Sequence, residues 1–583
     1  MSEQSNWKNL VQHKMSRRGF LRGASVAGAG VAAAAVLPAG LVGAAAPLAA
    51  AAQAMATPPF TPIVPSAADD IVLPEGFSYQ VIIKRGDVFT PDGRIFGDNA
   101  DWTGWYPIDA LEGGSSADEG LLVVNNEYLN PLFVSGYMGG EKTLDQVAKE
   151  KAAVGICVVH IRREGGKWMV VSDSPLARRY DATDRIAISG PAAGSAALDG
   201  ATEVIGTLAN CSGGQTPWLT ALSCEENFQD YYGEDKTKLG GGYGWYDAGG
   251  GTDGQIPEHY GWVVEVDPYS GRAVKRTALG RFRHENVAIA IGKSGKVVAY
   301  MGDDKRDECV YKFISAKTYD PNNREANLDI LDEGTLYVAN FGRGTWVPLV
   351  WEGNEQLLGD PSKVGGYTIA SQADVLTYCA QAARALGGTR TDRPEDIEVN
   401  PANGDVYIAF TNNSNHGNFH GQIVRLLEDG GDHEALKFDW DVFAVGGPQS
   451  GFSSPDNLVF DTNGDLWMVT DVSSGSLNKG IYKFMGNNSM FYFPTANAGQ
   501  GTAPAYLFAA GPVECEMTGP TWLDGSTLIL TIQHPGEETE DPAAPTSNWP
   551  DGPGSEPRAS VVAITGPFNQ SGKYNPMFYI PQA

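Results

Sequence analysis

The sequence predicts an all-β fold, a six-bladed β-propeller with loop and short helical insertions, and three observations lead to it. Short runs of β-branched and aromatic residues alternate with Gly, Asn-Gly and Asp-Gly turns, and the chain contains 72 Gly and 35 Pro. Long amphipathic helical patterns are scarce. A strand-turn-strand unit also recurs, and units too small to bury their own faces must stack against one another.

The recurring unit opens with an acidic residue, runs through an apolar strand, turns at a Gly and ends in polar residues after a second strand. Six segments fit it, the first two more loosely; they begin at Trp105, Asn210, Arg283, Arg393, Ser454 and Glu514. The opening residues Glu395, Asp456 and Glu516 are 61 and 60 positions apart. A β-sandwich also has many strands, but it does not place an acidic residue at the same point of every unit. We therefore predict a single propeller domain over residues 57–583.

Two segments interrupt the repeat. The spacing of apolar residues from Tyr367 to Leu386 is helical and predicts an insertion between blades. The Gly-rich segment 240–254 lacks the preceding strand and following helix of a phosphate-binding loop, so it predicts a surface turn.

Composition and cysteine usage narrow the function classes. The chain has 42 Lys and Arg against 70 Asp and Glu, a net charge of −28 at pH 7, and such a surface repels the phosphate backbone of nucleic acids. The six cysteines include no CxxC pair, which argues against a structural zinc site held by cysteines. Their even number leaves disulfides open in an exported protein.

Residues 1–56 are expected to be an export signal rather than part of the fold. Residues 16–21 read SRRGFL, a twin-arginine signature, and a mildly apolar Ala/Gly/Val stretch and small-residue cleavage options follow it. The Gly content and Pro38 make the stretch a weak membrane span, so no stable membrane anchor is expected. We expect a monomer that the twin-arginine translocase exports, already folded, to the periplasm or the extracellular space.

The repeat predicts a metal site in the channel, because the inner strands of a propeller line the channel and corresponding ends of the blades converge. The convergent residues are Glu127, Cys211, Glu226, Glu285, Glu395, Asp456, Asp471 and Glu516. So many carboxylates cannot all stay ionised together without bound cations. Carboxylates favour calcium and a thiolate favours a transition metal, so the mixture implies a mixed cluster.

Each residue also has a simpler interpretation. A single Asp or Glu beside a turn usually caps it, and Cys211 can be a small buried residue. His284 can hydrogen-bond a metal ligand or can be packed. Arg393, close to Glu395, can neutralise nearby carboxylates or can bind an oxyanion such as phosphate with its planar fork.

Several segments together resemble the PhoX-type alkaline phosphatases: GTLANCSGGQTPWLTALSCEEN, YMGDD, GTLYVANF, RPEDIEVNP, TNN, SPDNLVFD, GNN and IQHPGE. The resemblance runs from Leu73 to Phe578 and implies a secreted phosphomonoesterase on a six-bladed propeller, with Fe³⁺ and Ca²⁺ in the channel. The residues that it assigns to the metals are Cys211 for iron and Glu285, Glu395, Asp471 and Glu516 as carboxylate ligands. Arg393 would hold the substrate phosphate, with Glu395 and Asp471 beside it in the catalytic centre. Glu127 matches in part, since the family commonly reads Asn-His-Glu where this chain reads Asn-Asn-Glu.

The leading hypothesis is therefore a metal-dependent alkaline phosphatase that releases inorganic phosphate from small phosphate monoesters. No Ser or Thr is placed as a nucleophile, which favours attack by a metal-activated hydroxide. Two alternatives remain: a calcium-dependent lactonase or esterase, which needs neither a cysteine ligand nor a phosphate-binding arginine, and a non-catalytic exported calcium-binding propeller. Metal content separates them, because only the phosphatase requires iron together with calcium.

Overall fold

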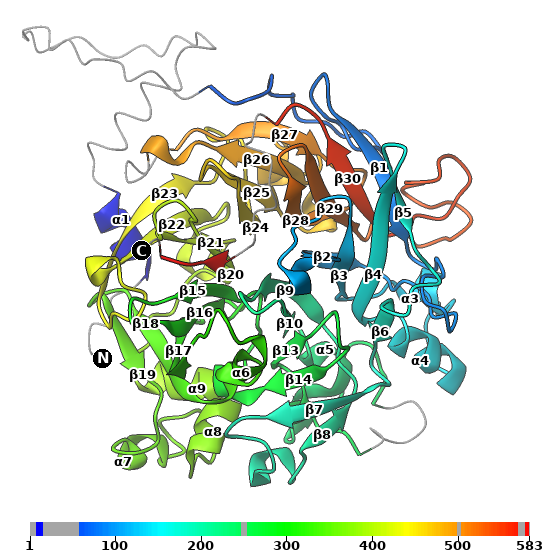
Figure 1. Cartoon of the computed structure of the whole chain (residues 1–583). Helices are drawn as coiled ribbons and strands as arrows, with labels where there is room; N and C mark the ends of the chain where they lie inside the picture. Colours follow the sequence, from blue (N-terminus) through cyan, green and yellow to red (C-terminus); the bar gives the residue numbers. More distant parts are fainter. Residues whose placement is uncertain (1–6, 16–56, 247–253, 498–502, 569–577, 582–583) are drawn as a thin grey trace, which may run out of the picture.

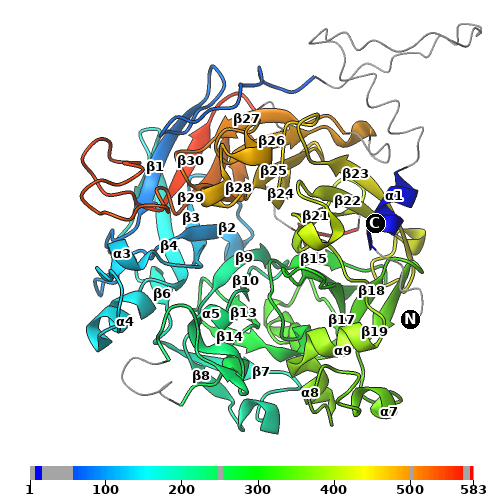
Figure 2. The same cartoon turned by 180° about the vertical axis from the view of Figure 1, so that it is seen from behind.

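Six sheets are arranged as blades around a central channel (Figure 1), in a computed structural model that describes residues 7–15, 57–246, 254–497, 503–568 and 578–581. The ring is equally clear from behind (Figure 2). The predicted all-β, six-bladed propeller is confirmed. In the described ranges no helix has the length and apolar character needed to cross a membrane.

Each blade is a sheet whose first main strand faces the channel. The first blade consists of β2 (Ala100–Pro107), β3 (Glu119–Asn126), β4 (Gly155–Glu164), β5 (Lys167–Val170) and β6 (Arg178–Tyr180). The second consists of β9 (Asn210–Gln215), β10 (Ala221–Glu225), β13 (Val263–Val266), β14 (Ala273–Arg276), β7 (Arg185–Ser189) and β8 (Glu203–Ile205). The third consists of β15 (Ala288–Ile291), β16 (Lys296–Gly302), β17 (Val310–Thr318), β18 (Gly334–Asn340) and β19 (Thr345–Pro348). Two short strands, β11 (Gly233–Asp235) and β12 (Lys238–Leu239), form a separate hairpin.

The last three blades each have four strands. The fourth blade consists of β20 (Pro394–Val399), β21 (Val406–Phe410), β22 (Gln422–Glu428) and β23 (Phe438–Val445). The fifth consists of β24 (Pro455–Phe460), β25 (Leu466–Thr470), β26 (Ser489–Phe493) and β27 (Tyr506–Ala510). The sixth consists of β28 (Glu516–Asp524), β29 (Thr527–Gln533), β30 (Ser560–Thr565) and β1 (Ser78–Lys84). The ring is closed because β1, from the start of the propeller, pairs antiparallel with β30. A further strand, β31 (Phe578–Tyr579), pairs in parallel with β15.

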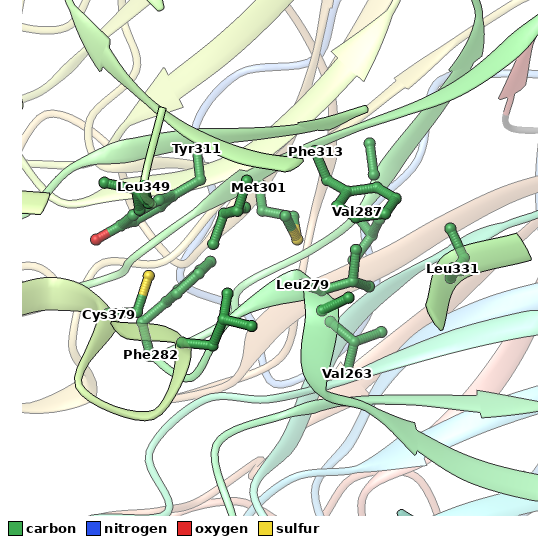
Figure 3. Close-up of a cluster of buried hydrophobic side chains, with 14 of the residues drawn as sticks. Val263, Leu279, Phe282, Val287, Met301, Tyr311, Phe313, Leu331, Leu349 and Cys379 are labelled. Atoms are coloured by element: carbon green, nitrogen blue, oxygen red, sulfur yellow. The ribbon is translucent and has the colours of Figure 1, made fainter. Parts of the chain in front are cut away.

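The core consists of apolar clusters between neighbouring blades, which is what a fold of stacked units requires. Figure 3 shows the cluster between the second and third blades, which includes Val263 of one blade and Val287 and Phe313 of the next. Five comparable clusters fill the other interfaces around the ring.

Helices are short and lie outside the blades. They are α1 (Trp7–Lys14), α3 (Pro131–Val134), α4 (Leu144–Lys151), α5 (Gln229–Tyr232), α6 (Arg324–Asn327), α7 (Glu355–Leu358), α8 (Gln372–Thr377) and α9 (Cys379–Ala385). Helices α8 and α9 confirm the predicted helical insertion, and Cys379 joins the cluster of Figure 3. Residues 247–253 of the Gly-rich segment lie outside the described residues, as do the twin-arginine signature and the cleavage options between residues 16 and 56.

Candidate metal centre in the channel

The start of each inner strand brings an acidic or thiol side chain to one end of the channel. These residues are Asp101 (β2), Cys211 (β9), Glu285 (before β15), Glu395 (β20), Asp456 (β24) and Glu516 (β28). All six are buried. Figure 1 shows the six strands around the centre, so residues far apart in the sequence meet because the blades repeat.

A second group of carboxylates follows the second strand of several blades. Glu127 comes after β3, Glu226 after β10, Asp304 after β16 and Asp471 after β25. Asp471 is half-buried and the other three are buried. Four of the six blades therefore supply carboxylates to this end of the channel from two neighbouring strands.

Cys211 lies among these carboxyl groups. Its Sγ is 3.2 Å from Glu285 Oε2 and 3.4 Å from Asp101 Oδ2. Three overlapping groups each have ligand atoms within 4.8 Å of one another: Asp101, Glu127 and Cys211; Cys211, Glu226 and Glu285; and Glu285, Glu395 and Asp456. Such distances allow one cation to be shared by three side chains in each group.

Burial and mutual repulsion disfavour the charged forms of these groups. Burial raises the pKa of Asp101 to about 6. Burial first, and neighbouring carboxylates second, raise the pKa well above the usual range for Glu127, Glu226, Glu285, Glu395, Asp456 and Glu516. Burial likewise raises the pKa of the Cys211 thiol. Cations would have to replace protons for these groups to be ionised at neutral pH.

Two further observations fit bound cations. Glu226 Oε1 and Asp304 Oδ1 are buried and have no hydrogen-bond partner in the described part of the chain. Buried carboxylate oxygens are otherwise almost always paired, and a metal ion satisfies them. An oxygen-rich set with one sulfur suits calcium together with a metal that accepts thiolate.

Arg393 is the basic side chain that pairs with this cluster. Its Nη2 lies 2.5 Å from Asp304 Oδ2 and 3.0 Å from Glu395 Oε1. The side chain retains 26% exposure, so it is not sealed from solvent. A guanidinium can donate to two oxygens of an oxyanion from its planar fork.

The backbone before these residues repeats as well. In five blades, the residue two positions before a cluster residue is not glycine and yet has a positive φ, between 38° and 61°. These residues are Asn99, Ala209, Arg393, Ser454 and Glu514. This left-handed conformation costs a side chain about 1 kcal/mol, so its recurrence in five blades marks a turn that precedes the acidic or thiol side chain of the channel.

Ser454→Gly is expected to raise the free energy of unfolding by about 0.5 kcal/mol, because Gly adopts φ of 49° without strain. Ser453→Gly is the matched control: its φ is not positive and its hydroxyl bonds His420 Nδ1 at 2.9 Å, so that change should destabilise. Denaturant unfolding of both variants measures the difference. Equal destabilisation would contradict a strained turn at Ser454.

The structure brings the predicted residues to one end of the channel. Seven lie in the buried cluster, and Asp471 lies at its edge. Burial raises the pKa of Asp471, and the charges of Arg393 and His534 oppose part of that rise. His284 is packed rather than turned to the cluster: its Nε2 is 2.8 Å from Gly280 O and its ring stacks on Phe282.

Two members of the cluster, Asp101 and Asp304, were missed by the sequence analysis. Asp101 occupies in β2 the position that Glu395 occupies in β20. A search for an acidic residue upstream of the first unit could have found it. Asp304 ends the segment YMGDD, but the sequence pattern does not indicate which of Asp303 and Asp304 lies in the channel.

Comparisons with known proteins bear on this site. The family model described as alkaline phosphatase PhoX matches residues 58–536. The structure of PhoX from Pseudomonas fluorescens, solved in complex with vanadate as a transition-state analogue, is 34% identical; the match covers 87% of this chain and 98% of that chain, with a TM-score of 0.77.

More distant structures include a protein of unknown function from Dyadobacter fermentans (10% identity, 84% and 100% of the two chains, TM-score 0.34). An α-L-arabinanase from Penicillium chrysogenum is similar at 12% identity (85% and 99% of the two chains, TM-score 0.36). No curated protein sequence matches the chain.

Proposed function

The chain belongs to the alkaline phosphatase PhoX family, and from that premise we propose that its channel binds Fe³⁺ and Ca²⁺ and hydrolyses small phosphate monoesters there. Family membership makes the protein a phosphomonoesterase. The observation that carries the proposal for the site is the ring of carboxyl groups with one thiol and one arginine at the same end of the channel. Vanadate binding by the Pseudomonas fluorescens relative supports an oxyanion site.

Cys211 would be the iron ligand, because a thiolate binds transition metals well and calcium hardly at all. The carboxylates that would hold the metals are Asp101, Glu127, Glu226, Glu285, Glu395, Asp456, Asp471 and Glu516. When bound, the metals supply positive charge for the phosphoryl oxygens and lower the pKa of water.

Arg393 would bind the phosphoryl group of the substrate. A dianionic ester approaching so many carboxyl groups needs a positive partner on the protein, and the partly exposed Arg393 has the planar fork that binds a phosphoryl group through two N–H donors. Glu395, 3.0 Å from Nη2, would hold the guanidinium in place. Asp471, half-buried nearby, completes the catalytic group at the mouth.

The channel and the family membership support neither of the two alternative functions, a calcium-dependent lactonase or esterase and a non-catalytic calcium-binding propeller. A calcium lactonase or a non-catalytic binding propeller gives no reason for a thiol within 3.2 Å of a carboxylate in the channel, and membership of a phosphatase family favours neither.

Metal removal is expected to abolish hydrolysis of a chromogenic phosphomonoester and to destabilise the fold increasingly as pH rises. In the metal-free protein the raised pKa values, about 6 for Asp101, mean that the folded state binds more protons than the unfolded chain. Stability contributed by these groups is then present at about pH 4 and lost as pH rises through about 6.

The difference in melting temperature between metal-loaded and chelated protein should therefore widen from about pH 4 to about pH 8. Elemental analysis accompanies each measurement, and iron with calcium should restore activity where calcium alone does not. A difference that is constant over pH would argue against a metal-neutralised carboxylate cluster.

We further propose export by the twin-arginine translocase, on the SRRGFL signature of residues 16–21. Replacing Arg17 and Arg18 by Lys is expected to leave the precursor in the cytoplasm, because the guanidinium pair is the recognised feature. Arg22→Lys is the control and should be exported. Pulse-chase fractionation measures the result, and full secretion of the double variant would refute this route.

A further inference from the structure

Helix α1 (Trp7–Lys14) packs on the folded propeller, although it belongs to the expected leader and directly precedes the arginine pair. Figures 1 and 2 both show it beside β23. The Trp7 side chain is 1% exposed. Its ring centroid lies 5.0 Å from that of Phe341, 4.9 Å from Phe410 and 5.2 Å from Trp440. We call these three aromatic residues the α1 socket.

One face of α1 is apolar and faces the propeller. Leu10, Val11 and Met15 follow Trp7 at helical spacing and pack against the same cluster. Gln12 is exposed. A helix of eight residues is too short to persist alone in water, so α1 depends on the socket for its helical structure.

The socket requires two folded blades. Phe341 follows β18 in the third blade, whereas Phe410 ends β21 and Trp440 lies in β23 of the fourth. The three rings converge only when these blades have packed together. Helix α1 can therefore dock only on a chain in which this part of the propeller has already folded.

Charge assists docking without making it permanent. Lys14 Nζ lies 2.5 Å from Asp439 Oδ1 and 5.2 Å from the Trp440 ring centroid. Asp439 is largely exposed, so salt screens the pair. Trp7 Nε1 is buried without a hydrogen-bond partner among the described residues, which weakens the docked state.

We propose that α1 is a releasable latch, which ties the leader to the folded propeller and withholds the arginine pair from its receptor until α1 detaches. This rests on the proposed export route. Met15 packs in the cluster only two residues before Arg17 in the sequence, so a receptor protein whose contacts extend from the pair to Met15 would displace α1 from the socket. Docking therefore competes with recognition, and it occurs only after the third and fourth blades have folded.

The test uses full-length precursor with Trp7→Ala, and Gln12→Ala as the matched control on the exposed face. Trp7→Ala should speed tryptic cleavage after Lys14 at least tenfold, and it should shorten the half-time of export in a pulse-chase. Gln12→Ala should match wild type in both. Phosphatase activity of the purified precursor should be unchanged, because α1 lies outside the channel cluster, whereas the melting temperature of Trp7→Ala should fall, because docked α1 stabilises only the folded blades.

A charge exchange tests the contact from the propeller side. Asp439→Lys should shorten the half-time of export in the same direction as Trp7→Ala but by a smaller factor, because the pair is exposed, and adding Lys14→Asp should restore slow export. Export is the readout for this pair of variants, since Lys14→Asp removes the trypsin site after residue 14. Equal cleavage of Trp7→Ala and Gln12→Ala would refute docking. If Trp7→Ala is cleaved faster but its export is unchanged or slower, docked α1 does not withhold the arginine pair from the receptor. Secretion of the Arg17→Lys, Arg18→Lys precursor would instead refute the export route itself, which separates the two failures.

Discussion

Cys211→Ser is expected to lose iron selectively, keep much of its calcium and lose most of its phosphatase activity. A serine hydroxyl stays protonated at neutral pH and is a poor iron ligand, whereas a thiolate binds iron strongly. The thiol lies 3.2 Å from Glu285 and 3.4 Å from Asp101, so its loss removes the sulfur donor from the middle of the cluster. Elemental analysis and any thiolate-to-iron absorption band measure the effect independently of turnover.

Cys224→Ser is the control for burial. Cys224 is also a free, fully buried thiol, but it packs in the apolar cluster between the second and third blades. Both variants should lose about 1–3 kcal/mol of stability through a buried hydroxyl, and only Cys211→Ser should lose iron. If purified Cys211→Ser retains iron and full turnover per folded molecule, Cys211 is a packing residue and the mixed-metal proposal fails.

Arg393→Lys is expected to lower kcat/KM for phosphomonoesters by about 10²–10³-fold and to weaken inhibition by vanadate. Lys keeps the positive charge and tolerates the same backbone strain, φ of 57°, but it cannot donate two parallel hydrogen bonds to one phosphoryl group. Metal content should be unchanged, because Arg393 donates to the carboxylates rather than coordinating metal.

Arg425→Lys in the same blade is the matched control. Arg425 also bridges two carboxylates, Asp405 at 3.1 Å and Asp441 at 2.7 Å, but it lies on β22, away from the channel. Its replacement should leave kcat/KM within about twofold of wild type. An equal effect of the two substitutions would indicate that Arg393 serves the fold rather than the substrate.

The repeating unit made the fold and most of the cluster predictable from the sequence. Units that open with an acidic residue at the same point must converge in a propeller, so Glu395, Asp456 and Glu516 could be placed together without coordinates. Asp101 escaped because the unit predicted for the first blade fits the repeat loosely and begins at Trp105, four residues after it. The register shift at the start of β2 is no explanation, since β20 and β24 have the same shift.

The role of α1 was beyond sequence reasoning for a different reason. A leader is recognised by its composition and is set apart from the fold on that ground. The socket that receives Trp7 consists of residues more than three hundred positions away, on two different blades. Tertiary packing alone brings them together, and the apolar spacing of Trp7, Leu10, Val11 and Met15 does not say which surface the helix covers.

The pairing of β1 with β30 has a consequence for synthesis on the ribosome. Ser78 and Thr565 face each other across this pair, 487 positions apart, so β1 leaves the ribosome long before its partner exists. Contacts of such long range form late, and the sixth blade cannot close while the chain is still growing. A chain that stopped before Glu516 would lack both β30, the partner of β1, and the proposed metal ligand Glu516. The nascent protein must therefore wait for residues 516–565 before it can become a competent enzyme.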